Sequence, residues 1–258
     1  MTTFNRIYQV YQIEGFRGLW IRMSFKILKR LKPKFTKSAY GIKLCSNWGD
    51  ATFASYFLGN YGYFFSHFLS QIEKKFVFLD IGANQGLYAI LASKNPKCHS
   101  VYAFEPVNEI ADLLKANIEA NSATGIFVHR AAISNFDGEK YVLLNQSHSG
   151  ATTLDTRSKA DHIGKKVKIK TISANALEDI IVDIIDDIIV KIDVEGHEET
   201  VLNELIKCRF FPKITKIFYE CDENWHSPER ISTLLENNGF NHFKKIGDGS
   251  HYDVLASR

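Results

Sequence analysis

Residues 76–86 read Phe76-Val77-Phe78-Leu79-Asp80-Ile81-Gly82-Ala83-Asn84-Gln85-Gly86. An apolar run ends in the carboxylate of Asp80, and two glycines four positions apart follow it. A helical pattern begins at Leu87, so the stretch predicts a strand, a tight glycine turn and a helix. In α/β proteins this arrangement presents backbone N–H groups and a helix N-terminus to a bound nucleotide-like molecule.

A second acidic residue closes a second apolar strand, Val101-Tyr102-Ala103-Phe104-Glu105. Glu105 follows Asp80 by 25 positions, a spacing that fits one βαβ unit. A carboxylate at that strand end can bind the hydroxyl groups of a ribose. The two strands together therefore predict a cofactor that contains adenosine.

The composition is that of a single soluble globular protein. The chain has 258 residues, of which 45% are hydrophobic and 24% charged, and this length allows one large core. No apolar stretch is long enough to span a bilayer, and the first residues do not resemble a signal peptide. Four scattered cysteines argue against a zinc site or a disulfide framework and favour a reducing compartment, so we expect a cytoplasmic protein.

A βα rhythm runs through most of the chain. Residues 187–194 are nearly all apolar without alternation, which is typical of a central parallel strand covered on both faces. Residues 240–246 and 252–256 predict a closing β-hairpin. The other strands that we expect are 76–80, 100–105, 125–133, 140–144, 166–172 and 215–220.

The glycine loop departs from the dinucleotide fingerprint G-x-G-x-x-G. It has one glycine fewer, and Asp80 stands where a dehydrogenase usually has an apolar residue. A closing antiparallel hairpin is typical of the class I methyltransferase fold. We therefore expect a mostly parallel, Rossmann-like sheet with an antiparallel C-terminal hairpin strand and helices on both faces. A nicotinamide-dependent oxidoreductase is the alternative.

Three motifs in this order resemble the FkbM-type methyltransferases. They are the loop of residues 80–86, then Phe104-Glu105-Pro106, and then Lys191-Ile192-Asp193-Val194-Glu195-Gly196-His197-Glu198. The small-residue loop of residues 149–154 and a late strand ending in Glu220 are also similar. The resemblance covers about residues 50–258, although His197 stands where the family more often has a small residue.

The resemblance implies methyl transfer from S-adenosylmethionine, mostly to oxygen, on sugars, polysaccharide units or secondary metabolites. We predict an O-methyltransferase that acts on a glycan or a sugar-linked metabolite. A non-catalytic module that binds S-adenosylmethionine is a further alternative. The residues predicted to bind the cofactor are Asp80, Gly82, Ala83, Asn84, Gly86, Glu105, Pro106, Ala132 and Asp193.

Asp193 and Glu195 are the predicted catalytic residues. A sugar hydroxyl is a poor acid, so a general base is expected, and both carboxylates lie at the end of the central strand. They share a face if that strand continues through Glu195. Glu198 is expected to stabilise the start of the next helix. For the acceptor we predict Ser149, Gly150, Thr152 and Glu220, with aromatic surfaces from Tyr61 and Trp225.

A divalent cation is an alternative that the pattern does not favour. Asp193, Glu195, Glu220 and Asp222 could hold Mg²⁺ through carboxylate oxygens, provided that the fold brings them together. Three histidines stand alone in the sequence and are expected to be structural or solvated: His129, His148 and His251.

The N-terminal segment differs in charge from the rest. Residues 1–38 hold nine Lys/Arg and one acid, a net charge of +8, which leaves −5 for the other residues because the chain carries +3. We expect a helix that ends near Pro33, within an extension of residues 1–48 attached to a methyltransferase domain of residues 49–258. The favoured interpretation is a helix that caps the domain.

The alternative is peripheral contact with the inner face of the cytoplasmic membrane, near a lipid-linked acceptor. Nucleic acid is not expected as a partner, because the rest of the chain is acidic and contains no base-reading motif.

Overall fold

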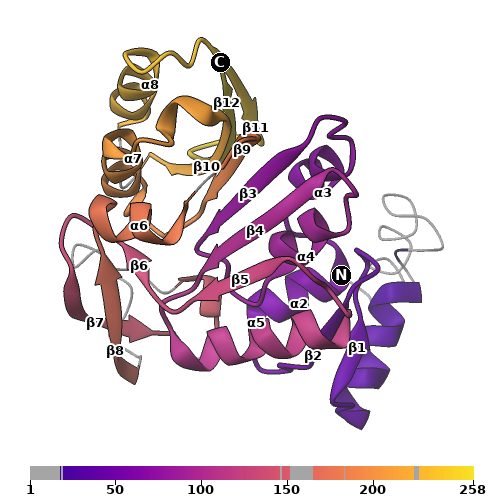
Figure 1. Ribbon diagram of the computed structural model, residues 1–258. Coiled ribbons are helices and arrows are strands. Elements are labelled where there is room, and N and C mark those ends of the chain that lie inside the picture. The colour runs from indigo at the N-terminus through magenta and orange to yellow at the C-terminus, as the bar shows by residue number, and fades with distance from the viewer. Residues whose placement is uncertain (1–17, 19, 146, 152–164, 183, 224–226) are drawn as a thin grey trace.

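A seven-stranded sheet forms the centre of the protein (Figure 1). The structure is a computed structural model, and it describes residues 18, 20–145, 147–151, 165–182, 184–223 and 227–258. Over these residues the strand order is β11-β12-β10-β9-β3-β4-β5, with β12 antiparallel to both β10 and β11 and the other neighbours parallel. The predicted sheet and its closing hairpin are confirmed. The strands are β3 (Phe76–Ile81), β4 (Cys98–Phe104), β5 (Ile126–His129), β9 (Asp187–Ile192), β10 (Ile214–Asp222), β11 (His242–Ile246) and β12 (His251–Ser257).

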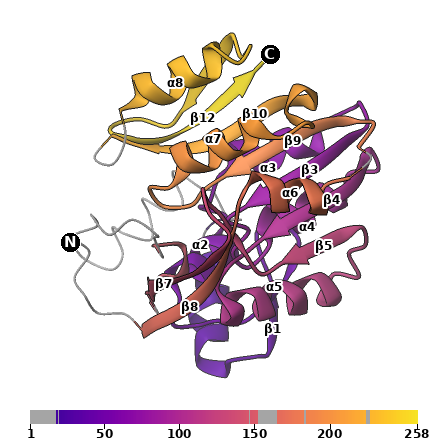
Figure 2. The same cartoon turned by 60° about the vertical axis from the view of Figure 1, so that its left-hand side comes forward.

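Helices cover both faces of this sheet (Figures 1 and 2). One core layer is rich in aromatic side chains and is called the aromatic layer; in it the rings of Phe65 and Phe218 stack with centroids 4.0 Å apart. Aliphatic side chains dominate the other layer. The first face carries α2 (Ala51–Leu58), α3 (Tyr63–Ser70), α4 (Leu87–Ser93) and α5 (Asn108–Ala120), and the second carries α6 (Ala174–Ile180), α7 (Glu198–Lys207) and α8 (Pro228–Glu236).

The apolar sequence of β9 does not alternate because both faces of this strand are buried. Ile188, Val190 and Ile192 pack into the aliphatic layer, whereas Ile189 packs into the aromatic layer. Successive side chains of a strand point to opposite faces, so a strand buried on both faces is apolar at nearly every position. Asp187 at the start of the strand is exposed, and Lys191 is the polar residue among the buried positions.

The single strand expected over residues 125–133 is wrong. The chain leaves the central sheet after β5, and β6 (Ala132–Ile133) pairs instead with β8 (Lys165–Ile172). Antiparallel β7 (Gly138–Leu144) completes this second, three-stranded sheet. The change of sheet follows from β4, which ends at Phe104 and offers β5 no partner beyond His129.

The N-terminal part packs beside α5 and α2. Residues 20–31 are helical, and β1 (Phe35–Lys37) and β2 (Lys43–Cys45) form a hairpin. The side chain of Asn117 on α5 accepts a hydrogen bond from the backbone of Cys45 at 2.5 Å. Two short 3₁₀ turns complete the described elements, η1 (Ser149–Ala151) and η2 (Phe211–Lys213). Among the described residues, no helix combines the length and apolar character needed to cross a membrane.

Gly86, which precedes α4, lies in close contact with α5. Its φ is 85°, and a Cβ there would lie 2.1 Å from Cδ1 of Leu114 on α5. Gly249 has nearly the same φ, 81°, with no atom within 4 Å of the corresponding Cβ. We expect Gly86→Ala to lower the free energy of unfolding by about 1–3 kcal/mol more than Gly249→Ala, because only the former overpacks the core. Urea denaturation of both variants measures the difference, and equal losses would contradict this packing.

Candidate cofactor and active site

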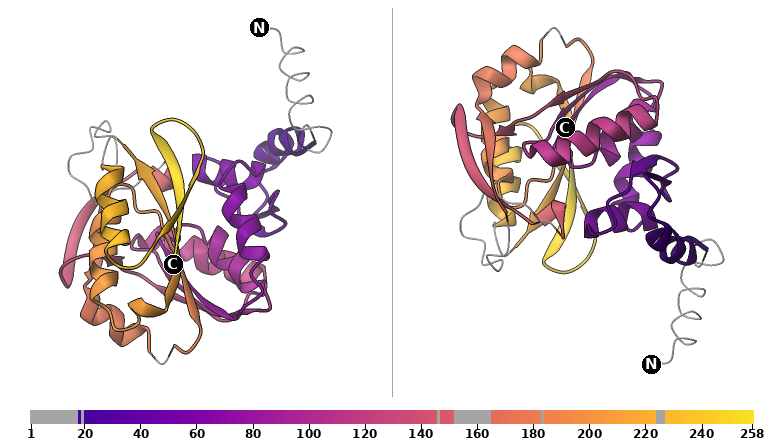
Figure 3. Two further views of the ribbon diagram at one scale, coloured as in Figure 1. Left: turned by 90° about the horizontal axis from the view of Figure 1, so that it is seen from above. Right: turned by 90° about the horizontal axis from the view of Figure 1, so that it is seen from below.

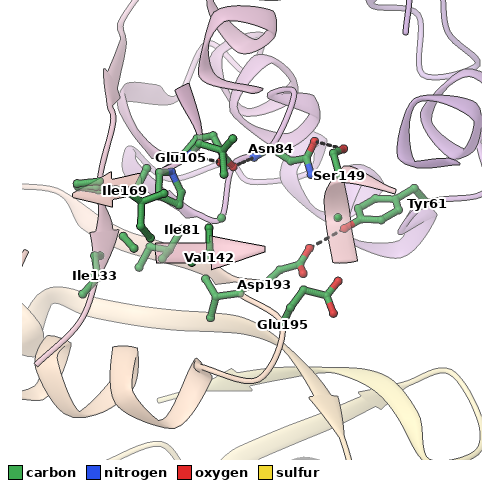
Figure 4. A pocket seen from close by; sticks show the side chains of 18 residues that line it. Tyr61, Ile81, Asn84, Glu105, Ile133, Val142, Ser149, Ile169, Asp193 and Glu195 are labelled. Atoms are coloured by element: carbon green, nitrogen blue, oxygen red, sulfur yellow. Dashed lines mark hydrogen bonds between the residues drawn. The ribbon is translucent and has the colours of Figure 1, made fainter. Parts of the chain in front are cut away.

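A cavity opens beyond the carboxyl ends of β3, β4 and β9, the edge at which open α/β sheets bind ligands (Figure 4). Of the predicted residues, it is lined by Tyr61, Gly82, Asn84, Glu105, Pro106, Ala132, Ser149, Gly150, Asp193 and Glu195. Asp80, Ala83, Gly86 and Glu220 are not part of this lining. Thr152 and Trp225 lie outside the described residues.

Glu105 is a buried carboxylate that two backbone groups hold in the cavity wall. Its Oε2 accepts a hydrogen bond from Asn84 N at 3.0 Å, and its Oε1 accepts one from Val107 N at 2.9 Å. Burial raises the pKa of Glu105 to about 7, although these two hydrogen bonds favour the charged form. The side chain is therefore fixed in position and changes charge near neutral pH.

Asn84 connects the glycine loop to the loop around Ser149. Its φ of 48° lies in the left-handed region. Its Oδ1 accepts hydrogen bonds from Gln85 N at 2.8 Å and from Ser149 Oγ at 3.1 Å (Figure 4). In addition, Thr52 Oγ1, in the first turn of α2, accepts a hydrogen bond from Gly150 N at 3.0 Å. These contacts place the Ser149–Gly150 backbone against the cavity.

A buried lysine joins the ends of β3 and β9. Lys191 Nζ lies 3.5 Å from Asp80 Oδ1 and 3.3 Å from Asp193 Oδ2, and it donates to Gly82 O at 2.6 Å. Burial lowers the pKa of Lys191, but Asp193 and Asp80 more than offset this, so the pKa is raised. Burial also raises the pKa of Asp80, against the effect of Lys191. Asp80 is thus connected to the cavity through Lys191.

Glu195 reaches the cavity through a turn. Strand β9 ends at Ile192, and Glu195 has a φ of 52°, so the strand does not continue through Glu195 and the condition for a shared strand face is not met. Glu198 Oε1 accepts from the backbone N–H groups of Val194 and Gly196, both at 3.2 Å, and so holds this turn. Glu198 is also the first residue of α7, so its charge lies at the helix N-terminus as expected.

Three carboxylates converge where the turn meets β10. Each of Asp193, Glu195 and Glu220 has a carboxylate oxygen within 4.8 Å of the others, a group that could hold a metal ion. Asp222 is not in the group. Burial, then the nearby charges of Glu220 and Asp193, raises the pKa of Glu195 to about 9. Three negative charges this close are unfavourable, so the group favours a bound proton or cation.

His251 and Tyr61 contact this cluster from two sides. His251 Nε2 lies 2.9 Å from Glu220 Oε1, and that hydrogen bond raises the pKa of His251 to about 9. The hydroxyl of Tyr61, from the segment between α2 and α3, donates to Asp193 Oδ2 at 2.6 Å (Figure 4). The expectation that His251 is merely structural or solvated does not account for its place in the cluster. Its pairing opposite Asp222 in the β10–β12 register puts it there.

The fold is that of a class I methyltransferase. The methyltransferase domain of METTL16 has a TM-score of 0.51 over 96% of this chain and 94% of that chain, at 11% identity. Ribosomal protein L11 methylase from Lactobacillus delbrueckii subsp. bulgaricus has a TM-score of 0.42, at 17% identity, over 75% of this chain and 76% of that chain. TrmK of M. capricolum, in complex with the cofactor product S-adenosyl-homocysteine, has a TM-score of 0.42, at 16% identity, over 75% and 66%.

A family model for the methyltransferase FkbM domain matches residues 80–241. The chain belongs to the FkbM methyltransferase family and is an S-adenosylmethionine-dependent methyltransferase. A comparison with curated protein sequences finds no match. The family match confirms the resemblance predicted from the three motifs and decides against the nicotinamide-dependent oxidoreductase.

Replacing Lys191 tests the buried ion group. Lys191→Met leaves the carboxylates of Asp80 and Asp193 without their cation, so we expect a loss of about 3–5 kcal/mol in the free energy of unfolding near neutral pH. The loss should shrink as the pH falls, because the burial that raises the pKa of Asp80 makes it easy to protonate. Lys216→Met, on the neighbouring strand β10, is the matched control. Urea unfolding at two pH values gives the comparison, and a pH-independent loss would argue against this explanation.

Proposed function

We propose that the protein methylates a hydroxyl group of a glycan, such as a sugar of a surface polysaccharide or lipopolysaccharide, or of a sugar-linked metabolite. The proposal rests on the three carboxylates of Asp193, Glu195 and Glu220, which gather at the edge of the cavity. Carboxylates can accept hydrogen bonds from several sugar hydroxyls, and one of them can remove the proton from the hydroxyl that is methylated. We place this chemistry in the cytoplasm.

The cavity residues fit S-adenosylmethionine. Glu105 offers two carboxylate oxygens for a ribose diol, and apolar side chains near it, including Val107 and Ile133, can flank an adenine ring. The far end of the cavity is acidic at Asp193, which suits the ammonium group of the methionine part. When bound, the cofactor supplies an electrophilic methyl group. The other predicted cofactor residues, Asp80, Ala83 and Gly86, are proposed to shape the loop from behind.

In this proposal the three carboxylates have different roles. Asp193 is held by Tyr61 and Lys191, so we assign it to binding and orientation. Glu195 is the candidate general base in its ionised form, which the raised pKa makes the minor form at neutral pH but a stronger proton acceptor than an ordinary carboxylate. Glu220, paired with His251, is proposed to bind the acceptor together with Ser149, Gly150 and Thr152. A divalent cation at the three carboxylates is not required by this scheme.

The charge of Glu105 gives the cofactor site a pH dependence. A ribose diol donates hydrogen bonds to an ionised carboxylate, and Glu105 has a pKa of about 7. Below that pH, binding must first displace a proton, so the affinity for S-adenosylhomocysteine should rise about tenfold per pH unit towards pH 7 and then level off. Isothermal titration across this range measures it.

Two variants identify the carboxyl group that causes this pH dependence. Glu105→Gln should bind more weakly and lose the pH dependence. Asp253→Asn removes another carboxyl group, whose pKa is also raised to about 7 by burial. This variant should keep the pH dependence of binding. An unchanged slope in Glu105→Gln would overturn the assignment of Glu105 to the ribose.

Glu195→Gln tests catalysis and acceptor together. We expect methylation to fall by roughly 10²–10⁴-fold, the usual contribution of a general base, while S-adenosylhomocysteine still binds. The readout is mass spectrometry of surface glycans from cells that contain the wild-type protein, the variant or neither. Glu236→Gln, an exposed carboxylate on α8, is the control and should methylate normally.

The outcomes separate the parts of the proposal. A sugar methyl group that is lost in cells lacking the protein and in Glu195→Gln cells supports both acceptor and base. Glycans that are identical with and without the protein would overturn the acceptor class. Full methylation by Glu195→Gln would overturn the base and leave the acceptor standing. Methylation of the unmethylated glycan by the purified protein, measured with EDTA and with added Mg²⁺, tests for a metal requirement.

A further inference from the structure

The helix of residues 20–31, within the proposed extension of residues 1–48, is anchored to the domain through one face. Ile21, Phe25 and Leu28 pack against the aromatic core layer. The ring of Phe25 lies 5.2 Å from that of Phe57 and 5.6 Å from that of Trp48, measured between centroids. The helix therefore has a fixed orientation and presents defined faces outward.

A second face of this helix is apolar and exposed. It consists of Trp20, Met23, Ile27 and Leu31, whose exposed fractions are 72%, 51%, 56% and 71%. Spacings of three and four residues align these side chains in one stripe along the helix. The helix lies at the periphery of the molecule (Figures 1 and 3). Contiguous exposed apolar side chains of this size indicate an interaction surface.

The third face is basic. Lys26, Lys29 and Arg30 are exposed beside the apolar stripe. From residue 18 to residue 38 the chain holds seven Lys/Arg and no acid. A partner of this helix must therefore accept apolar side chains and carry negative charge next to them.

We propose that this helix docks on an anionic lipid surface. The stripe from Trp20 to Leu31 inserts at the boundary between headgroups and acyl chains, and Lys26, Lys29 and Arg30 contact the lipid phosphates. Amphipathic helices with a basic face bind membranes through this combination of apolar burial and charge attraction. The opposite face stays on the aromatic layer, so the whole enzyme is held at the surface.

Other occupants of the stripe match these observations less well. A second copy of the chain would bring two basic faces together, which costs energy. Residues 1–17 carry Arg6 and Arg17 and one acid, Glu14, and so offer no excess of negative charge. A nucleic acid would satisfy the basic residues but would leave the aliphatic side chains of the stripe in water.

Vesicle co-sedimentation of the full chain tests the proposal. We expect binding to vesicles of phosphatidylglycerol with phosphatidylcholine, weakening at high ionic strength, and little binding to phosphatidylcholine alone. The double variants Trp20→Ser/Ile27→Ser and Lys26→Glu/Arg30→Glu should each lower the apparent partition coefficient by about tenfold or more.

Matched substitutions elsewhere provide the controls. Ile185 is 88% exposed, so Ile185→Ser removes an exposed apolar side chain, and Lys97→Glu/Lys115→Glu reverses two exposed charges outside the helix. Both should bind vesicles like the wild type. Binding of S-adenosylhomocysteine should be unchanged in every variant, which shows that the fold is intact and keeps this test independent of the acceptor.

Three results would overturn the proposal. They are the absence of binding to anionic vesicles, an equal loss of binding in the helix variants and the controls, and binding to single-stranded RNA without binding to vesicles.

Discussion

A single buried ammonium group allows two acidic residues to end two adjacent strands. Lys191 lies between Asp80 and Asp193 and also binds the carbonyl of Gly82. Without a cation, two carboxylates at this depth would repel each other and would bind protons instead. The lysine therefore stabilises the charges that the site needs and fixes the distance between the loops after β3 and β9.

Close contact between those two loops determines where the other residues of the site lie. Gly82 has a φ of 76°, and a Cβ there would lie 1.9 Å from the carbonyl oxygen of Asp193, so the backbones touch. One side of this contact leads through Asn84 to Glu105 and Ser149. The other side leads through the Asp193 carboxylate to the acidic cluster. A side chain at position 82 would push both halves of the site apart.

Much of this arrangement could be predicted from apolar runs that end in acidic residues. Asp80, Glu105 and Asp193 each follow such a run, and the carboxyl ends of parallel strands meet at one edge. Gly196 indicates a turn, but the place of Glu195 depends on its own left-handed conformation, which the sequence does not indicate. The contact of His251 with the cluster depends on the register of β12 on β10, which the alternation of side chains does not determine.

The central position of β9 has a consequence for synthesis of the chain. This strand pairs with β3, although more than one hundred residues separate the two in sequence. A nascent chain that ends before Asp187 lacks the neighbour that covers one edge of β3 and lacks the lysine that neutralises Asp80. The glycine loop after β3 is therefore translated early, but its contacts with β9 form late. The unpaired edge of β3 remains exposed until the ribosome has passed the second half of the sheet.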